Sequence, residues 1–346
     1  MAVPPRVAPL RVAVVLAGAV AKGAFEAGVL QALARTSVDI VRVVAASSGA
    51  LNGTLLASAV RTRSVPQGVD LLAELWRNNA GWTDVVHANF SDITQRRSVS
   101  DSKRVLELLR ERIPPVDRAD VEPINLRLLV APLNGVAGTI GDHPASTFES
   151  VRDFESPDFA TAASLERVFA AATASSAFPF LFAPVEIDDI GPCVDGGAVN
   201  NTPVKWALEG TLGASLDAIV VVSTMVELRT APAAALHGLA YAGHLATMLI
   251  GERLYRDLHE AEQVNAQLAN LMSLVDAGVI DGAQLASVLN ALDWSGRRPV
   301  TIMQIRPEAE LPGTSFSGFA EPAQRRAYLA AGLARGLAVL QHAGWI

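Results

Sequence analysis

The stretch from Val41 to Gly53, with the sequence VRVVAASSGALNG, constrains the fold of this chain more than any other segment. A run of β-branched apolar residues ends abruptly at small residues, and an alanine- and leucine-rich helical pattern follows at once. This pattern predicts a strand, a sharp turn at Ser47 or Ser48, and a helix. A serine at such a turn stands at the carboxyl edge of a sheet, with its hydroxyl exposed above the N-terminus of the helix.

Ser47 has two interpretations. In the first it is a nucleophile, because the spacing is one glycine short of a G-x-S-x-G elbow: Ala45 stands where the first glycine would be, and Gly49 supplies the second. Small residues at these two elbow positions let neighbouring backbone approach a strained turn. In the second interpretation the serine is a helix N-cap, for which serine is among the preferred residues. This segment alone leaves both open.

The composition bounds the class of protein. With 346 residues, 50% of them hydrophobic, the chain can bury a large core as one large α/β domain or two smaller ones. The net charge is −7 and no cluster of lysine and arginine stands out, which argues against a nucleic-acid partner. The excess of arginine over lysine is typical of a GC-rich bacterial genome. Cys193 is the single cysteine, so an internal disulfide and a multi-cysteine zinc site are excluded, and a cytoplasmic location is expected.

Two apolar stretches are expected to be buried and not to span a membrane. Residues 12–20 lead straight into an amphipathic helix without a processing break, which argues against a signal peptide. The segment from Ala233 to Gly251 approaches spanning length, but it contains His237 and His244 and is rich in small residues. We expect it to form a buried helix or a lid, and it is a candidate wall for an acyl chain.

Buried strands and amphipathic helices alternate along the chain, which predicts an α/β fold with parallel strands and right-handed crossovers. Strands are expected at residues 10–17, 41–45, 216–223 and 300–306, and helices at 24–33, 50–59, 69–78, 101–112, 165–173, 203–208, 233–273, 284–292 and 322–340. Asn134-Gly135 predicts a hairpin between strands at 124–132 and 136–141. Residues 1–346 are expected to form one domain with helical insertions. Its catalytic core would span 8–225, and 226–346 would be mainly helical with a late strand.

The turn from Gly18 to Gly23 follows the first predicted strand. It is not a P-loop, because Lys22 lacks the flanking Gly and Ser/Thr, and it is not a dinucleotide fingerprint, because Val20 occupies a required glycine position. A glycine turn before a helix can still offer backbone N–H groups to an anion, such as the oxygen of a tetrahedral intermediate. The alternative is a plain strand–helix turn.

Asp195 opens a second glycine-rich turn, Asp195-Gly196-Gly197. A carboxylate at a tight turn can orient or deprotonate a nucleophile if the turn faces Ser47. The alternative is an ordinary turn aspartate of the kind that begins many loops.

Together, these segments resemble the patatin-like phospholipases. The resemblance covers VVLAGAVAKGAFEAGVLQAL and VVAASSGALNG, between Val14 and Gly53, and AATASSAFPFLFAPVEI and VDGGAVNNTPV, between Ala171 and Val204. It implies a three-layer α/β/α sandwich with a mainly parallel central sheet. It also implies a Ser–Asp dyad without histidine, in which Ser47 matches the nucleophile and Asp195 the general base. The residues that match the oxyanion loop are Gly18, Ala19 and Val20, with Lys22 in the basic position of the family.

The chain departs from the family pattern at two places. Gly18-Ala19-Val20 stands where the family commonly carries three glycines, and Ala45 replaces the first glycine of the elbow. Valine resists positive φ, which leaves open whether the oxyanion hole uses other N–H groups or is less competent.

An unperturbed carboxylate with a pKa of about 4 is ionised at pH 7 and is a weak base, so much of the rate would have to come from oxyanion stabilisation. The histidines that follow Asp195 lie on helical patterns or near the end of the chain and are expected to be structural; they are His237, His244, His259 and His342. Cys193 lacks an activating base and is expected to be a buried thiol. No metal-ligand cluster is visible, so no cofactor and no calcium requirement are expected.

The sequence therefore predicts a serine acyl hydrolase that cleaves carboxylic esters of phospholipids, lysophospholipids or related lipids through an acyl-enzyme. Its partner would be a lipid or ester substrate, with peripheral membrane contact left open and no oligomeric state indicated. Two alternatives remain. One is an acyltransferase or thioesterase on the same scaffold, and the other is a non-catalytic lipid-binding protein.

Overall fold

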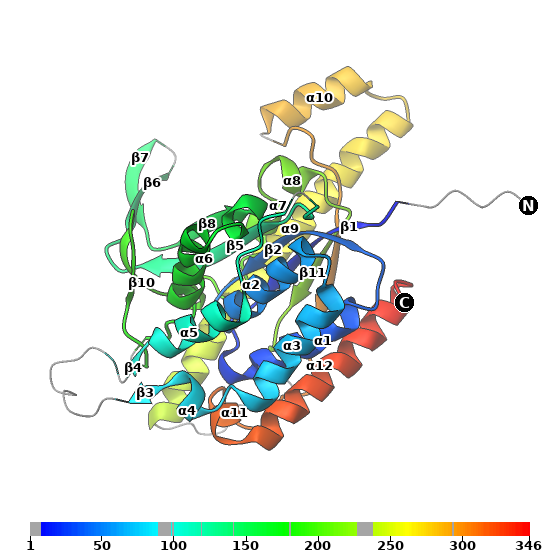
Figure 1. Ribbon diagram of the computed structural model, residues 1–346. Coiled ribbons are helices and arrows are strands. Elements are labelled where there is room, and N and C mark those ends of the chain that lie inside the picture. Colours follow the sequence, from blue (N-terminus) through cyan, green and yellow to red (C-terminus); the bar gives the residue numbers. More distant parts are fainter. Residues whose placement is uncertain are drawn as a thin grey trace, which may run out of the picture.

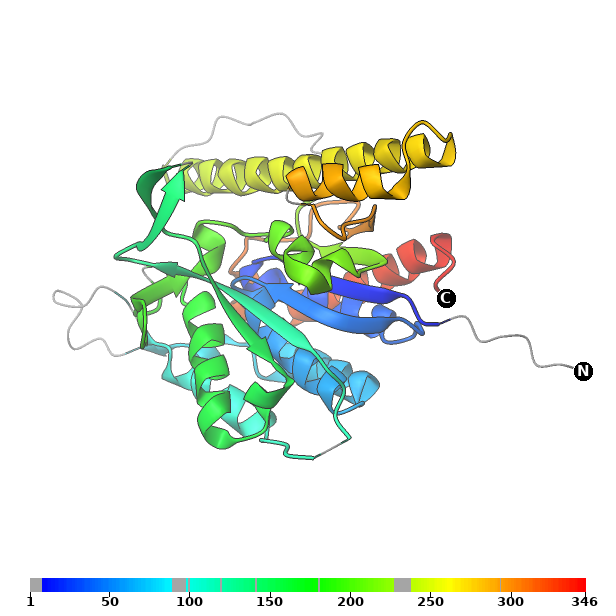
Figure 2. The ribbon, with the colours of Figure 1, turned by 90° about the horizontal axis from the view of Figure 1, so that it is seen from above.

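The computed structural model describes residues 8–88, 98, 100–118, 120–140, 142–179, 181–226, 238–292 and 294–346. A central sheet runs through this part of the chain, and helices cover both of its faces (Figures 1 and 2). The predicted three-layer α/β/α sandwich is therefore the fold of the protein.

The central sheet has eight strands among the described residues, in the order β12-β11-β1-β2-β5-β10-β9, with β8 pairing β5 beside this path. The strands from β12 to β5 pair in parallel, whereas β8, β10 and β9 add antiparallel pairs. Their bounds are β12 (Thr301–Ile305), β11 (Ala218–Val222), β1 (Arg11–Leu16), β2 (Asp39–Ala45), β5 (Asn125–Pro132), β10 (Gly191–Asp195), β9 (Val185–Ile187) and β8 (Ser150–Glu155).

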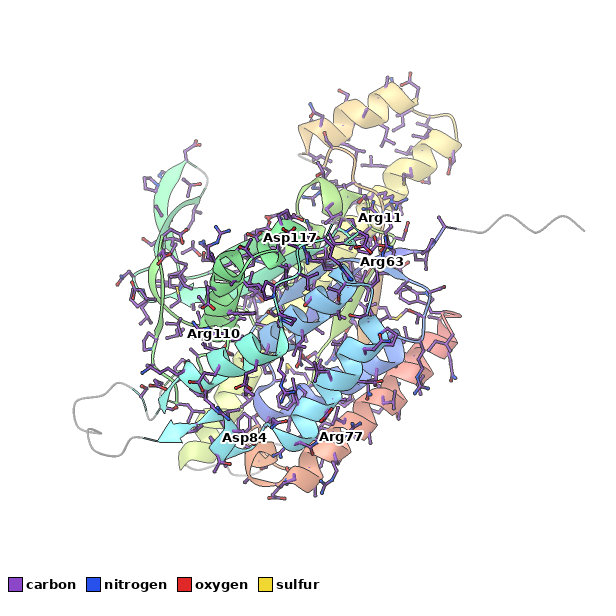
Figure 3. The ribbon with its side chains drawn as sticks, viewed as in Figure 1. Arg11, Arg63, Arg77, Asp84, Arg110 and Asp117 are labelled. Carbon is purple, nitrogen blue, oxygen red and sulfur yellow. The ribbon has the colours of Figure 1, made fainter. Side chains whose placement is uncertain are left out.

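Helices pack on both faces because the central strands are apolar on both sides. One face carries α1 (Gly23–Leu33), α2 (Ser48–Arg61), α3 (Val65–Asn78), α5 (Lys103–Arg112), α6 (Ala162–Ser175) and α12 (Pro322–His342). The other carries α7 (Lys205–Leu208), α8 (Gly210–Ala214) and α9 (Gly238–Asp276), with α10 (Gly282–Ala291) against α9. The amphipathic helices keep their charges outside: Arg77 of α3 and Arg110 of α5 lie on the outer surface (Figure 3).

The register of the sheet brings two distant loops to one level. Ala45, the last residue of β2, pairs with Leu128 of β5. Two residues further along β5, Val130 pairs with Asp195, the last residue of the antiparallel strand β10. Because Ser47 follows Ala45 by the same two residues, Ser47 and Asp195 lie at the same level of the sheet.

The predicted hairpin around Asn134-Gly135 is wrong in its pairing. The turn exists, with a φ of 67° at Gly135, but β5 does not pair with the strand that follows the turn. That strand, β6 (Val136–Ile140), pairs instead with β7 (His143–Thr147) in a separate two-stranded ribbon. The reason is that both edges of β5 are already occupied, by β8 along one edge and by β2 and then β10 along the other.

The apolar segment from Ala233 to Gly251 lies partly outside the described residues, which resume at α9. No helix in the described part of the chain is long and apolar enough to cross a membrane. Further along, α9 packs Leu254 and Leu258 against the sheet, and Arg253 forms an ion pair of 3.1 Å with Glu149.

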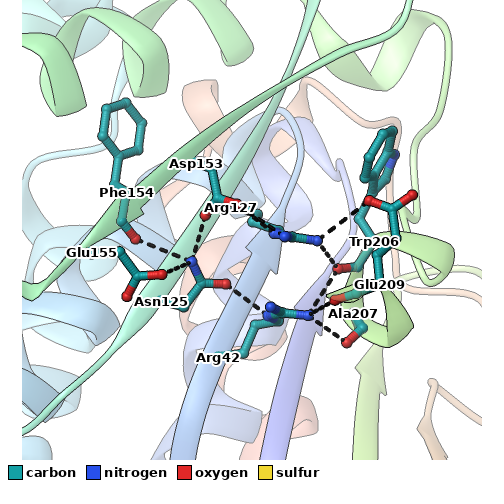
Figure 4. Close-up of polar contacts among 9 residues, drawn as sticks. All are labelled: Arg42, Asn125, Arg127, Asp153, Phe154, Glu155, Trp206, Ala207 and Glu209. Carbon is teal, nitrogen blue, oxygen red and sulfur yellow. Dashed lines mark hydrogen bonds and ion pairs between the residues drawn. The ribbon is translucent and has the colours of Figure 1, made fainter. Parts of the chain in front are cut away.

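A buried arginine fastens α7 to the sheet (Figure 4). Arg42 of β2 donates hydrogen bonds of 2.7 Å to Asn125 Oδ1, 2.9 Å to the Ala207 carbonyl and 2.7 Å to the Glu209 carbonyl. Burial lowers the pKa of Arg42 to about 10. Arg127, in the neighbouring strand β5, forms an ion pair of 3.6 Å with the Glu209 carboxylate. Since α7 follows the Asp195 loop, these contacts anchor the end of that loop to β2 and β5.

The packing of α1 against α12 depends on glycines. A Cβ atom added at Gly28 of α1 would collide with the Leu329 carbonyl oxygen and lie 2.7 Å from the Leu333 nitrogen. A Cβ atom at Gly332 of α12 would collide with the Phe25 carbonyl oxygen. The two backbones therefore touch, and no side chain separates them.

We expect Gly28→Ala to lower the free energy of unfolding by about 1–3 kcal/mol, because the helices must move apart to admit the methyl group. Urea denaturation measures this. Gly282→Ala, in α10, is the matched control: a Cβ atom there meets nothing within 4 Å. That change should be neutral or stabilising, by up to about 1 kcal/mol. Equal destabilisation of both variants would contradict the close packing of α1 and α12.

Candidate active site

Ser47 stands at the sharp turn between β2 and α2. Its φ of 56° and ψ of −132° lie in a region that side-chain-bearing residues rarely adopt, as expected of a strained strand–helix elbow. The turn is buried, with only 5% of Ser47 exposed. The Ser47 N–H donates a 3.0 Å hydrogen bond to the Ser175 hydroxyl at the end of α6, which fixes the turn from a second element.

The small residues of the elbow have different roles. A Cβ atom added at Gly49 would lie 2.7 Å from the carbonyl oxygens of both Leu16 and Ala17, so this position requires glycine. Ala45 is tolerated in the place of the first elbow glycine because Gly53 faces it: a Cβ atom at Gly53 would be 3.1 Å from the Ala45 Cβ.

Asp195 lies directly beside the serine. Ser47 Oγ donates a 2.6 Å hydrogen bond to Asp195 Oδ2, and the Gly197 N–H donates one of 2.7 Å to Asp195 Oδ1. The carboxyl is only 2% exposed, and this burial raises its pKa to about 7, although both hydrogen bonds act in the opposite direction. The sequence-based expectation of a pKa of about 4 was wrong, because it used the ordinary value of a carboxylate and Asp195 is buried.

The loop after β1 wraps over the same turn. A Cβ atom added at Gly18 would lie 2.7 Å from the Ser47 Cβ, so only glycine allows this approach. Val20 adopts a φ of 52° despite its branched side chain. The Lys22 ammonium donates a 3.2 Å hydrogen bond to the Leu311 carbonyl, and burial lowers its pKa, opposed by nearby Glu310.

The N–H groups of this loop are unequally engaged. The Gly18 N–H donates to the Asn201 carbonyl at 2.9 Å, and the Ala19 N–H donates to the Ser48 hydroxyl at 3.1 Å. Among the described residues, neither the Val20 N–H nor the Ser48 N–H at the start of α2 donates a hydrogen bond. These two N–H groups flank Ser47 and remain available to an anion.

Sequence reasoning missed two residues that lock the site together. Asn201 holds the β1 loop from both sides, because its carbonyl accepts from Gly18 and its Nδ2 donates to the Gly18 carbonyl at 2.8 Å. Ser175 is fully buried and bonds Ser47. Both residues lie in segments that resemble the patatin-like phospholipases, so that resemblance is the signal that could have identified them.

An apolar cavity opens at Ser47, which we call the Ser47 cavity. The empty space of the cavity, counted together with the open solvent at its mouth, is about 930 Å³, and one face each of α2, α3 and α5 lines it. Val20 and Ser48 lie beside Ser47 in its wall, and Phe178 and Phe319 contribute rings. None of its described lining residues comes from the segment at 233–251 that the sequence suggested as an acyl wall; most side chains of that segment lie outside the described residues.

His259, His342 and Cys193 do not line the Ser47 cavity. His259 stacks on Tyr255 and approaches Gln263 Nε2 at 3.0 Å, on the surface of α9. The His237 side chain and the His244 side chain are not among those described, and His342 is exposed at the end of α12. Cys193 is buried, which raises the pKa of its thiol to about 11. The described residues contain no group of three or more His, Cys, Asp and Glu side chains arranged to hold a metal ion.

The protein thus has an α/β/α fold with a serine and an aspartate paired at the edge of its sheet. The family model described as patatin-like phospholipase matches residues 14–208, and the chain belongs to this family. No curated protein matches the chain in sequence. Among solved structures, VipD from Legionella pneumophila is similar to this chain at 13% identity and a TM-score of 0.41. The alignment covers 97% of this chain and 67% of the VipD chain.

We expect Asp195 to make folding stability fall with pH. Its pKa in the folded chain, about 7, exceeds the ordinary value of 3.8, so the folded state keeps the proton longer than the unfolded state. The contribution is complete below pH 4 and is lost as the pH rises through 7. In Asp195→Asn the melting temperature should therefore decline less between pH 4 and 7 than in wild type. Parallel curves for the two proteins would contradict the raised pKa.

Proposed function

We propose that this protein hydrolyses carboxylic esters of phospholipids, lysophospholipids or related lipids, with Ser47 as the nucleophile and Asp195 as the general base. The observation that supports this best is the 2.6 Å hydrogen bond from Ser47 Oγ to Asp195 Oδ2 at the mouth of the Ser47 cavity. A nucleophile within hydrogen-bond reach of its base, beside an apolar cavity, is what acyl transfer from a lipid requires.

In the first half of the proposed reaction, Asp195 takes the hydroxyl proton as Ser47 Oγ bonds to the ester carbonyl carbon. The carbonyl oxygen becomes an anion, and the Val20 and Ser48 N–H groups are the donors placed to stabilise it. The positive end of the α2 dipole adds to this stabilisation. The tetrahedral intermediate then collapses, and the leaving alcohol takes the proton from Asp195.

In the second half, water attacks the acyl-enzyme. Asp195 accepts a proton from the water as its oxygen bonds to the acyl carbon, and a second tetrahedral intermediate forms. When the bond to Ser47 Oγ breaks, Asp195 returns the proton to the serine and the free fatty acid leaves. One carboxylate therefore serves as base and acid in turn, which suits a group whose pKa lies near the working pH.

We expect Ser47→Ala and Asp195→Asn to abolish turnover, with kcat for a short-chain p-nitrophenyl ester reduced at least about 1,000-fold. A fluorophosphonate should add once to the wild type, not to Ser47→Ala, and much more slowly to Asp195→Asn; intact-mass measurement reads all three. Ser58→Ala, which removes a hydroxyl from the same helix far from the turn, is the control and should react like wild type. A folded wild-type protein that binds lipid vesicles but gives no adduct would favour the lipid-binding alternative.

We expect kcat/KM to rise with pH along a single limb with its midpoint near 7, because Asp195 must lose its proton to act as the base. Below the midpoint the rate should fall about tenfold per pH unit. A pH profile from 4 to 9 with a soluble ester measures this. A midpoint near 4 would show that the catalytic base is a solvated carboxylate and not buried Asp195.

A further inference from the structure

The Ser47 cavity follows one face of α2. Ser47 and the α2 residues Ser48, Leu51, Asn52 and Leu55 line it, at the three- and four-residue spacing of a single helix face. The cavity therefore runs from the serine along the helix axis, between α3 on one side and α5 on the other.

The cavity ends below Leu55. One turn further along α2, Ala59 meets Gly68 of α3 so closely that a Cβ atom at Gly68 would collide with the Ala59 Cβ. The first residue of α3 to line the cavity is Leu72, and the last of α5 is Leu109. Leu55, Leu72 and Leu109 are thus the lining residues at this end of the cavity, and we call them the leucine floor.

Asn52 is a polar residue in the wall between Ser47 and the leucine floor, but its side-chain amide is already hydrogen-bonded to other residues. Asn52 Nδ2 donates to the Gly23 carbonyl at 3.1 Å and to Glu26 Oε2 at 2.8 Å, and Asn52 Oδ1 accepts from Trp76 Nε1 at 2.9 Å. Glu26 is fully buried behind it, and burial raises its pKa well above the ordinary value, which favours the uncharged acid. The Asn52 amide is thus fully paired on its cavity face and does not penalise an apolar ligand.

The distance from Ser47 to the leucine floor determines how long an acyl chain the cavity can hold. Leu55 follows Ser47 by eight residues, which at about 1.5 Å per residue gives about 12 Å. A C–C bond of about 1.5 Å advances an extended chain by roughly 1.3 Å, so the cavity holds about nine such bonds.

We propose that the leucine floor is a ruler for acyl-chain length, and that the preferred substrates are lipid esters with a straight acyl chain of about eight to ten carbons. This rests on the proposed function and specifies its substrate. A chain that reaches the floor buries every methylene group. A longer chain has to bend or leave its end in the mouth, and a shorter one leaves the floor uncovered.

The test is the chain-length profile of kcat/KM for p-nitrophenyl esters from four to sixteen carbons, each below its critical micelle concentration. Each added methylene group should raise kcat/KM by about four-fold until the chain reaches the floor, and longer chains should gain nothing or lose. A profile that rises steadily to sixteen carbons would overturn the proposal.

Leu55→Ala and Leu72→Ala should each move the optimum about two to three carbons higher, because the change empties the volume of about three methylene groups at the floor. Leu56→Ala is the matched control: it removes the same group from the same helix, but Leu56 is 2% exposed in the core and does not line the cavity. Its profile should keep the wild-type optimum. An unchanged optimum in both floor variants would overturn the proposal.

The wild type alone supplies a second measurement that does not depend on a folded variant. The labelling rate by straight-chain alkyl fluorophosphonates should rise with chain length and stop rising at about eight to ten carbons. A rate that continues to rise beyond this length would overturn the proposal. Absence of any labelling would refute the proposed function itself, so the two failures are distinguishable.

Discussion

The hydrogen bond between Ser47 Oγ and Asp195 Oδ2 joins residues 148 positions apart in the chain, and the arrangement of the site depends on it. Among the described residues, the Asp195 carboxyl takes part in two hydrogen bonds, and it has almost no contact with solvent, so its negative charge is poorly compensated and its pKa rises to about 7. This buried carboxyl costs stability at neutral pH. The same burial brings the pKa of the Asp195 carboxyl close to neutral pH, where it transfers protons more effectively than a solvated aspartate would.

Close packing of three loops makes this burial possible. Gly18 and Gly197 allow backbone to approach the serine, since a Cβ atom at these positions would lie 2.7 and 3.3 Å from the Ser47 Cβ. Asn201, Ser48 and Ser175 then pair the backbone groups that this packing removes from water. The N–H groups of Val20 and Ser48 donate no hydrogen bond to any described residue. Unpaired N–H groups beside a proposed nucleophile are the expected preparation for a charge that exists only during the reaction.

The Ser47 cavity also depends on how segments distant in the sequence pack, in this case helices on one face of the sheet. Its walls are the inward faces of helices whose outward faces carry charge, so the amphipathic pattern that folds α3 and α5 also makes the cavity apolar. The helices leave a space near the serine and approach closely at Ala59 and Gly68, where the missing side chain of the glycine admits the Ala59 methyl group. Cavity depth is therefore set by helix packing, and the proposed substrate length follows from it.

The sequence by itself determined the α/β class, the strand–turn–helix at Ser47 and the aspartate turn, because these depend on short-range periodicity and turn chemistry. It misjudged the partner of β6, since strand pairing depends on which edges of β5 other segments already occupy. It also gave no access to the raised pKa of Asp195, the engaged N–H groups of Gly18 and Ala19, or the Ser47 cavity. Each of these arises from contacts between segments far apart in the chain. A local sequence pattern does not specify which groups are buried or which hydrogen-bond partners they have.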